Sequence, residues 1–315
     1  MTLREPPKVP HTTKLIGRIV GLVLLISVFA LVVWTAATNQ QATAIERSNP
    51  LAHAPGEHVA AGGALFHVRS FGSGSPTTLL IHDDTVSGGT QLTPLASDLA
   101  ESGRRVILPD LVGYGFSSRP EQPGRSLSTT GLTESLAELL DEMGIPPVEV
   151  IGFGWGGEVA AELAVTRPEL VMRLVFVDTP SLPVPTDGWH SLMALPLGVG
   201  EAVAYTREGA GEAAAERFRT ECPSWAECIG PEIAEEYRHA TEVPGTARAV
   251  WARRASGRAT VAGARMTEID IPVTVVAVDG TREDAETLAD RLPDAEVVVI
   301  TADELVEVLW GPSEG

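Results

Sequence analysis

Residues 148–163, Val-Glu-Val-Ile-Gly-Phe-Gly-Trp-Gly-Gly-Glu-Val-Ala-Ala-Glu-Leu, decide the fold of this chain. The apolar run at 148–151 predicts a buried strand, a glycine-rich turn follows at 152–157, and apolar residues at helical spacing begin after it. A strand, a sharp turn and a helix in this order form a nucleophile elbow, the G-x-S-x-G device that places a serine above a parallel sheet. The spacing of the motif is intact here, but its third position is Gly154.

Two further blocks occur in the order that one known superfamily requires. Residues 75–82, Ser-Pro-Thr-Thr-Leu-Leu-Ile-His, resemble the strand that ends in His-Gly in the α/β-hydrolase superfamily. Residues 105–117, Arg-Val-Ile-Leu-Pro-Asp-Leu-Val-Gly-Tyr-Gly-Phe-Ser, resemble its D-x-x-G-x-G-x-S stretch. The likeness covers residues 56–310 and implies an α/β-hydrolase fold, with a mostly parallel central sheet flanked by helices.

Strand and helix patterns alternate along the globular part, as in a mostly parallel sheet with helices on both faces. We predict strands at 64–71, 77–82, 105–108, 148–151, 170–177, 272–278 and 296–300, and helices at 92–101, 133–143 and 282–291. The alternation stops within 183–265, where we predict the helical cap that many members insert above the pocket. The core is therefore expected in two segments, 57–182 and 266–315.

The N-terminal segment is expected to meet a membrane. Residues 19–37 carry no charge and are rich in valine, leucine and isoleucine, close to the roughly 20 residues that span a bilayer as a helix. We predict a basic cytoplasmic tail at 1–14, a transmembrane helix at 15–37 and a polar linker at 38–56. Because basic residues precede the apolar run, the positive-inside rule places the N-terminus in the cytoplasm and the globular domain outside.

A cleaved secretory peptide is the alternative for this segment. Ala42-Thr43-Ala44 has the small-x-small form of a cleavage site, although the apolar run is longer than the usual signal-peptide core. Both interpretations export the domain. The net charge of −19 disfavours a nucleic-acid partner, because phosphates require a basic face.

The chain has two cysteines, Cys222 and Cys228, which flank Pro-Ser-Trp-Ala-Glu within the predicted cap. In an exported domain an even pair of cysteines predicts a disulfide. The alternative is a pair of buried thiols.

A hydrolase of this superfamily requires a nucleophile at the elbow, an acid after the seventh strand and a histidine after the eighth. Gly154 has no side chain, Thr281 stands at the acid position, and Glu304 stands about where the histidine belongs. The last histidine of the chain is His239, in the predicted cap. A glutamate with an ordinary pKa of about 4.3 is a poor base for an alcohol at neutral pH. No catalytic group is therefore expected to be intact.

The oxyanion hole is expected from the backbone N–H of Trp155 and that of the residue after His-Gly. Here His82 is followed by Asp83 and Asp84, and a carboxylate beside the developing charge opposes the transition state. These four residues and Gly154 define the predicted pocket region. We expect no metal, because a second His/Cys cluster to complete a site at His82-Asp83-Asp84 is missing, and no cofactor.

Asp110 and Ser117 belong to the block at 105–117. Asp110 is expected to fix its loop by accepting backbone N–H bonds, and Ser117 to cap the same loop rather than to react. His67, in a predicted strand, is expected to be structural.

Changes in all four parts of the mechanism indicate a domain that is no longer used for acyl transfer, as in some cholinesterase-like adhesion proteins. We predict a membrane-anchored, extracytoplasmic, non-catalytic protein whose partners are the bilayer (through 15–37), an envelope or membrane protein, and an apolar small molecule or lipid. Two alternatives stay open. One is an esterase-like hydrolase with relocated groups, such as His190 or His239 with Ser191, and the other is an accessory subunit of a membrane complex.

Overall fold

An eight-stranded sheet forms the centre of the molecule. The computed structural model describes residues 11–45, 50–120, 125–180, 198–208, 216, 230–255, 262–278 and 282–310. Its strands are β1 (Glu57–Ala61), β2 (Ala64–Phe71), β3 (Thr77–Ile81), β4 (Arg105–Pro109), β5 (Val148–Phe153), β6 (Val171–Val177), β7 (Val273–Val278) and β8 (Ala295–Ile300). Their order is β1-β2-β4-β3-β5-β6-β7-β8, and β2 pairs antiparallel with both β1 and β4. The other pairs are parallel, which confirms the predicted mostly parallel sheet.

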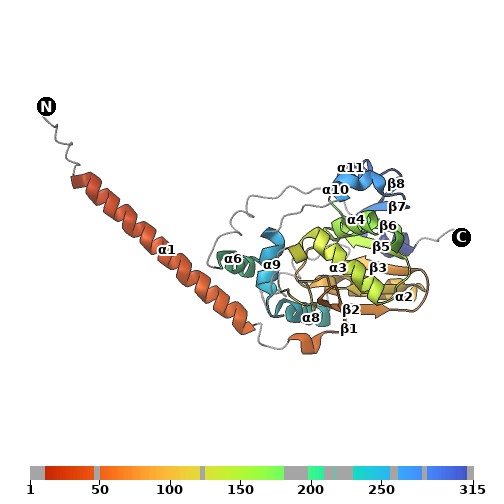
Figure 1. Cartoon of the computed structure of the whole chain (residues 1–315), viewed down its shortest axis with the longest axis horizontal. Coiled ribbons are helices and arrows are strands. Elements are labelled where there is room, and N and C mark those ends of the chain that lie inside the picture. The colour runs from red at the N-terminus through yellow and green to blue at the C-terminus, as the bar shows by residue number, and fades with distance from the viewer. Residues whose placement is uncertain are drawn as a thin grey trace.

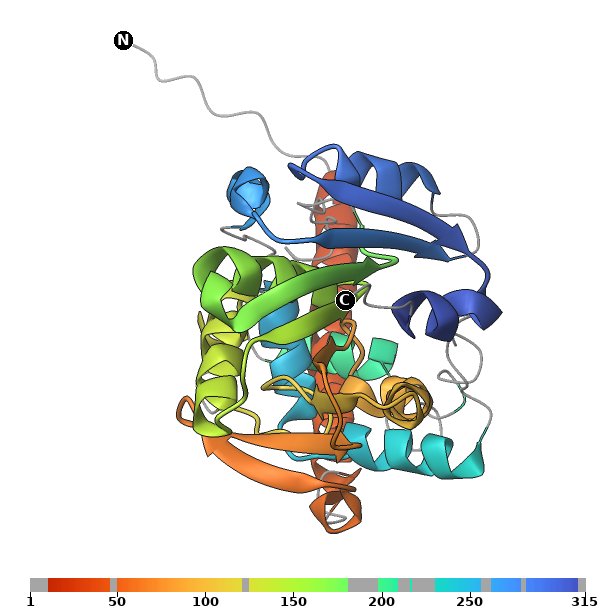
Figure 2. The ribbon, with the colours of Figure 1, turned by 90° about the vertical axis from the view of Figure 1, so that its right-hand side faces the viewer.

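Helices cover both faces of this sheet (Figures 1 and 2). Helices α3 (Thr129–Glu142), α4 (Gly156–Thr166) and α11 (Arg282–Ala289) share one apolar cluster with the strands. Helices α2 (Thr93–Glu101) and α12 (Leu305–Trp310) share the other. Successive residues of a strand face opposite sides, so Leu79 and Ile81 of β3 belong to the first cluster and Leu80 to the second.

Between residues 183 and 265, the elements that the structure describes are all helices. They are α6 (Val199–Glu208), α8 (Pro231–Thr241), α9 (Thr246–Ala255) and α10 (Ala262–Arg265). Figure 1 shows α6 and α9 between the sheet and the long N-terminal helix α1 (His11–Ile45). The helical content agrees with the expectation for this range, whose role as a cap stays a prediction.

The N-terminal elements differ from the sequence prediction. Helix α1 does not end at residue 37 but continues through Ile45, and a 3-10 turn at Pro50–His53 follows before β1. Much of the range predicted as a linker, 38–56, is therefore folded. Strand β1 was missing from the prediction, because it is short and largely exposed.

Strand β5 places the elbow at the centre of the sheet. It lies between β3 and β6, and all six of its residues are buried. The strand extends to Phe153, two residues beyond the predicted end at 151, and α4 begins at Gly156. The predicted strand, turn and helix are thus present in the predicted order.

The other end of β5 carries a buried charge. Glu149, which is 4% exposed, accepts hydrogen bonds from Arg173 (Nη1 to Oε1, 2.8 Å), Arg104 and Thr78. Arg104 also donates to the carbonyl of Leu309 at 3.0 Å. The carboxylate therefore links the centre of the sheet to α12.

We predict that Glu149→Gln destabilises the protein by about 3 kcal/mol, because removing one partner from a buried ion pair leaves the remaining charge uncompensated. Urea unfolding followed by tryptophan fluorescence measures the change. Glu169→Gln is the matched control, since Glu169 pairs with Arg167 at an exposed site and exposed pairs contribute little. Equal effects of the two substitutions would contradict this account of Glu149.

Candidate functional site

The backbone at the elbow has the conformation that a nucleophile elbow requires. Gly154 has a φ of +51°, in the left-handed region that strains every residue with a side chain. Its N–H donates to the carbonyl of Val177 in β6 at 2.9 Å, and α4 starts two residues later. The strained geometry is therefore present although position 154 carries no reactive group.

The carboxylate of Asp83 fills the space above Gly154. An ideal Cβ built on Gly154 would lie 2.4 Å from Cγ of Asp83 and 2.5 and 2.6 Å from its two oxygens. Atoms that are not bonded do not approach so closely, so a side chain at 154 and the observed position of Asp83 exclude each other. The carboxylate occupies the place where a nucleophile side chain would begin.

The same carboxylate accepts the two N–H groups assigned to the oxyanion hole. The N–H of Trp155 donates to Oδ1 of Asp83 at 2.6 Å, and the N–H of Asp84 donates to the same oxygen at 2.7 Å. Burial raises the pKa of Asp83, and these two N–H bonds oppose that rise by favouring the charged form. The hole is thus formed, and its occupant is the chain's own side chain.

His82 is not available as a general base in this arrangement. Its Nε2 accepts the N–H of Leu111 at 3.0 Å, which leaves the proton on Nδ1, and Nδ1 donates to the carbonyl of Asp83 at 2.7 Å. Burial lowers the pKa of His82 and keeps the ring neutral. Both nitrogens are used to hold the loop that carries Asp83.

A buried arginine closes the site from the side of α9. Arg253 is 2% exposed, its guanidinium lies 4.0 Å from the ring centroid of Trp155, and its Nη2 lies 4.0 Å from Oδ2 of Asp84. The hydroxyl of Tyr114 donates to Oδ1 of Asp84 at 2.6 Å. A cation over an indole face is attracted by the ring quadrupole. Sequence analysis missed Arg253, because its place in a helix far along the chain gives no local signal.

The loop of the third block is fixed as predicted. Asp110 accepts the N–H of Gly89 at 2.7 Å and that of Phe116 at 2.8 Å, while His67 Nδ1 lies 2.8 Å from its Oδ2. Burial acts to raise the pKa of Asp110, but the hydrogen bond from His67 and the charge of Arg69 bring that pKa well below the ordinary range. The expected roles of Asp110, Ser117 and His67 are confirmed, with Ser117 Oγ donating to the carbonyl of Asp110 at 2.5 Å.

Glu304, at the expected position of the triad histidine, caps a helix. It is exposed, and its carboxylate accepts the N–H of Thr301 at 2.8 Å and the Thr301 hydroxyl at 2.9 Å. These bonds lower the pKa of Glu304.

The acid position, Thr281, lies outside the described residues, as do the predicted disulfide residues Cys222 and Cys228 and the alternative groups His190 and Ser191.

The last histidine of the chain contacts another histidine. His239 of α8 stacks on His53 with ring centroids 4.0 Å apart, and its Nε2 lies 3.2 Å from Oε1 of Glu235. In the part of the chain that the structure describes, no group of three His, Cys, Asp or Glu residues is arranged to hold a metal ion.

Asp178 is a second residue that sequence analysis missed. It directly follows β6, the strand beside the elbow, and its Oδ1 accepts the N–H of Val278 at 2.8 Å. Its φ of +46° is the one positive value of a non-glycine residue in the described chain. Its place directly after an apolar strand was the available signal. In this structure the carboxylate joins the ends of β6 and β7.

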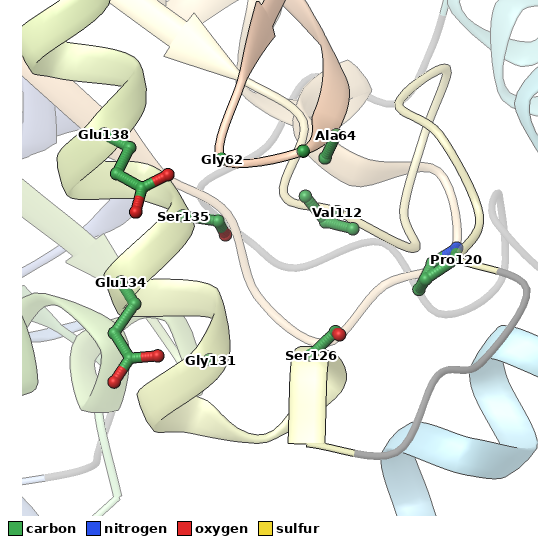
Figure 3. Close-up of a pocket in the computed structure, with 10 residues that line it drawn as sticks. Gly62, Ala64, Val112, Pro120, Ser126, Gly131, Glu134, Ser135 and Glu138 are labelled. Carbon is green, nitrogen blue, oxygen red and sulfur yellow. The ribbon is translucent and has the colours of Figure 1, made fainter.

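A separate pocket of about 260 Å³ lies between the β1–β2 turn and α3 (Figure 3). Glu134, Ser135 and Glu138 line it from α3, and Gly62 and Ala64 line it from the turn. Its lining shares no residue with the elbow. It is an open, polar surface pocket, and the predicted pocket region around Gly154 is a different place.

Comparison with known proteins identifies the family. A model of the alpha/beta hydrolase fold matches residues 87–269, more than half of the chain, and the chain belongs to this family. The 2-hydroxymuconate semialdehyde hydrolase of Pseudomonas putida is 32% identical over 130 residues, 41% of this chain and 45% of that protein. Epoxide hydrolase 3 of Siraitia grosvenorii is 34% identical over 124 residues, or 37% of its length. The matches therefore span less than half of these relatives.

Solved structures show the same fold over a larger part of the chain. The meta-cleavage product hydrolase of Pseudomonas fluorescens superposes with a TM-score of 0.61 at 16% identity, over 81% of this chain and 96% of that one. The enol-lactonase of Burkholderia xenovorans gives a TM-score of 0.61 at 18% identity, over 80% and 98%. At these identities the likeness establishes the fold alone.

The contact between Gly154 and Asp83 predicts a measurable coupling. We expect Gly154→Ala to destabilise the protein by about 3 kcal/mol, from left-handed strain and from displacement of the carboxylate. In an Asp83→Gly background the space is free, and the cost should fall to about 1 kcal/mol of strain. Thermal or urea unfolding of the four proteins measures both values.

Gly144→Ala is the matched control for this cycle. Gly144 has a φ of +59° and no atom within 4 Å of an added Cβ, so its substitution should cost only the strain and should be insensitive to Asp83. If Gly154→Ala and Gly144→Ala cost the same in both backgrounds, Asp83 does not occupy the elbow.

The lowered pKa of Asp110 predicts a pH dependence of stability. The unfolded chain protonates this carboxyl more readily than the folded one, so its contribution is fully present at neutral pH and is lost as the pH falls below the ordinary aspartate range. We expect Asp110→Asn to cost about 3 kcal/mol at pH 7 and less as the pH falls below about 4. Asp141→Asn, at an exposed ion pair, serves as the control, and a pH-independent loss in Asp110→Asn would refute the assignment.

Proposed function

We propose that this protein is a non-hydrolytic member of the α/β-hydrolase family that acts by binding, as a ligand-binding or protein-interaction domain. The observation that carries the proposal is the position of Asp83, whose carboxylate accepts both oxyanion-hole N–H groups above Gly154. An acyl substrate needs those two donors for the oxygen that becomes negative. Because the donors are already bound to a carboxylate oxygen of the chain, a tetrahedral intermediate finds neither room nor stabilisation.

The neighbouring groups support the same conclusion. A base for an elbow hydroxyl is needed within hydrogen-bond reach, but both nitrogens of His82 hold backbone groups and Glu304 caps a helix at an exposed position. Position 154 itself offers no nucleophile. Nucleophile, base and oxyanion hole are therefore changed together.

We further propose that the domain is anchored in a membrane and faces the outside of the cell. Leu15–Ala44 of α1 is long and apolar enough to cross a bilayer by length and composition, and the basic residues before it favour an inside N-terminus. A cleaved secretory signal has the same features and would also export the domain. In either case we propose a disulfide between Cys222 and Cys228, since exported domains favour oxidised pairs.

The proposed place at a membrane indicates the class of ligand or partner. An apolar small molecule, a lipid or an envelope protein is compatible with a domain held at a membrane, and an accessory role in a membrane complex is a variant of the same proposal. Nucleic acid is disfavoured by the net charge of −19.

The second candidate is an ester-type hydrolase with relocated groups. The observation in its favour is that the curated relatives of known activity are hydrolases. It requires a new nucleophile and base, for which His190 or His239 with a cap serine such as Ser191 are the candidates. The experiment below separates it from the binding protein.

We expect the purified full-length protein to remain unlabelled by a serine-directed fluorophosphonate probe and to hydrolyse no p-nitrophenyl ester above buffer. Gly154→Ser alone should stay inactive, because the new hydroxyl has no base and clashes with Asp83. Members of a catalytic set act as a unit, so one restored member does not restore the rate. In-gel fluorescence and intact mass measure labelling.

Clear labelling of the wild-type protein that disappears in His239→Ala would overturn the proposal in favour of the relocated hydrolase. Arg238→Ala, next to it on α8, is the control for a general disturbance of that helix. Labelling that persists in both variants would place the nucleophile elsewhere and would equally exclude a non-hydrolytic protein.

A further inference from the structure

The last turns of α1 have one buried face, whereas residues 15–34 of the helix are exposed. Thr35, Thr38 and Ala42 are 4%, 7% and 6% exposed, and with the half-buried Asn39 they stand at the i, i+3, i+4 and i+7 positions of one helical face. The large apolar residues from Leu15 to Trp34 are all at least 39% exposed. The helix is therefore exposed on all sides up to Trp34 and packed on one side from Thr35 onward.

Helix α6 covers this face (Figure 1). Gly198, just before α6, approaches so closely that a Cβ on it would lie 2.7 Å from Nδ2 of Asn39. The face of α1 is built from small and polar side chains, which allow two helices to approach closely. On its other side α6 packs against α9, where Val250 of α9, Ala204 of α6 and Val86 form a buried apolar cluster.

The packed face occupies the C-terminal end of the candidate span Leu15–Ala44, where the apolar run at 19–37 is followed by the polar residues 38–41. Residues 35–42 extend about 12 Å along the helix axis, whereas the headgroup region of a bilayer is roughly 5–8 Å thick on each side. A helix that packs on these residues must therefore lie within or directly above the headgroup layer. A flexible tether would let the domain turn in every direction, but a docked helix fixes which side faces the lipid.

We propose that the α6 side of the domain is a membrane-contacting surface, held against the lipid headgroups by the docking of α1 on α6. Helices α6 and α9 then lie between the bilayer and the elbow, and α2 lies on the far side of the sheet (Figure 1). The partner of this surface is the headgroup layer of the bilayer that α1 crosses. This inference rests on the proposed membrane anchor, and it does not depend on whether the elbow is catalytic.

The height of two sites above a bilayer tests the proposal. Full-length protein is reconstituted into phosphatidylcholine nanodiscs that contain a headgroup-labelled acceptor lipid. A donor dye is attached through an unnatural amino acid either at Thr206 of α6 or at Asp98 of α2, both of which are exposed. We expect the Thr206 donor to lose most of its fluorescence by energy transfer and the Asp98 donor to lose little.

Two alanines of α1 provide matched variants. Ala42 lies on the buried face of α1, the helix that packs against α6, whereas Ala44 is exposed. Ala42→Trp should force the helices apart and remove the difference between the Thr206 and Asp98 donors, and Ala44→Trp should preserve it. Intact mass confirms that the reconstituted chain retains α1.

Three results would overturn the proposal. Equal transfer at the two sites in the unmodified chain would show a freely turning domain. Stronger transfer at Asp98 would reverse the orientation. A mature protein that has lost α1 and does not associate with the nanodiscs would show that the helix is a cleaved signal. None of these results bears on the esterase assay, so this proposal and the non-hydrolytic proposal fail independently. Loss of α1 would also overturn the proposed anchor, whereas the first two results would leave the anchor standing.

Discussion

Two backbone N–H groups, those of Trp155 and Asp84, converge on one carboxylate oxygen of Asp83. The remaining features of the site depend on this contact. In an active hydrolase the same two donors are left open for an oxygen that becomes negative only in the transition state. Here they bind a carboxylate of the chain itself, and the loop after β3 is tied to the elbow after β5.

Gly154 is the residue that makes this contact possible. A Cβ at position 154 would overlap the carboxylate. Asp83 can therefore occupy the oxyanion hole only because position 154 has no side chain. Glycine also relieves the strain of a φ of +51°. The fold therefore keeps the backbone geometry of a nucleophile elbow while its chemistry is absent. Arg253 and Tyr114 then surround Asp84 and limit the space beside the elbow.

Much of the fold could be predicted from the sequence, because apolar periodicity is a local signal. The buried strands β3 and β5 and the order of strand, turn and helix at the elbow follow from short runs of residues. Strand β1 was not predicted, because it is short and largely exposed. The end of α1 was not predicted, because the small and polar residues of its docked face are also typical of a linker.

The sequence identifies each altered position of the catalytic site, such as Gly154, but it does not show how these residues are arranged in space. A carboxylate at 83 was expected to oppose catalysis by its charge alone; its location in the oxyanion hole requires β3 and β5 to be neighbours in the sheet. Arg253 reaches Trp155 from a helix about 100 residues further along the chain, and such a contact between distant segments leaves no pattern in the sequence itself. The role of Glu304 has a local pattern, because Thr301 and Glu304 have the spacing of a capping box.

The occupancy of the oxyanion hole is tested most directly by crystal structures of the wild-type protein and of Asp83→Gly, each grown in acetate. The wild-type crystal should show the Asp83 carboxylate on the N–H groups of Trp155 and Asp84, with acetate absent from the hole. The Asp83→Gly crystal should show an acetate oxygen on the same two donors. A wild-type structure in which Asp83 points to solvent and the two N–H groups are open would contradict the account.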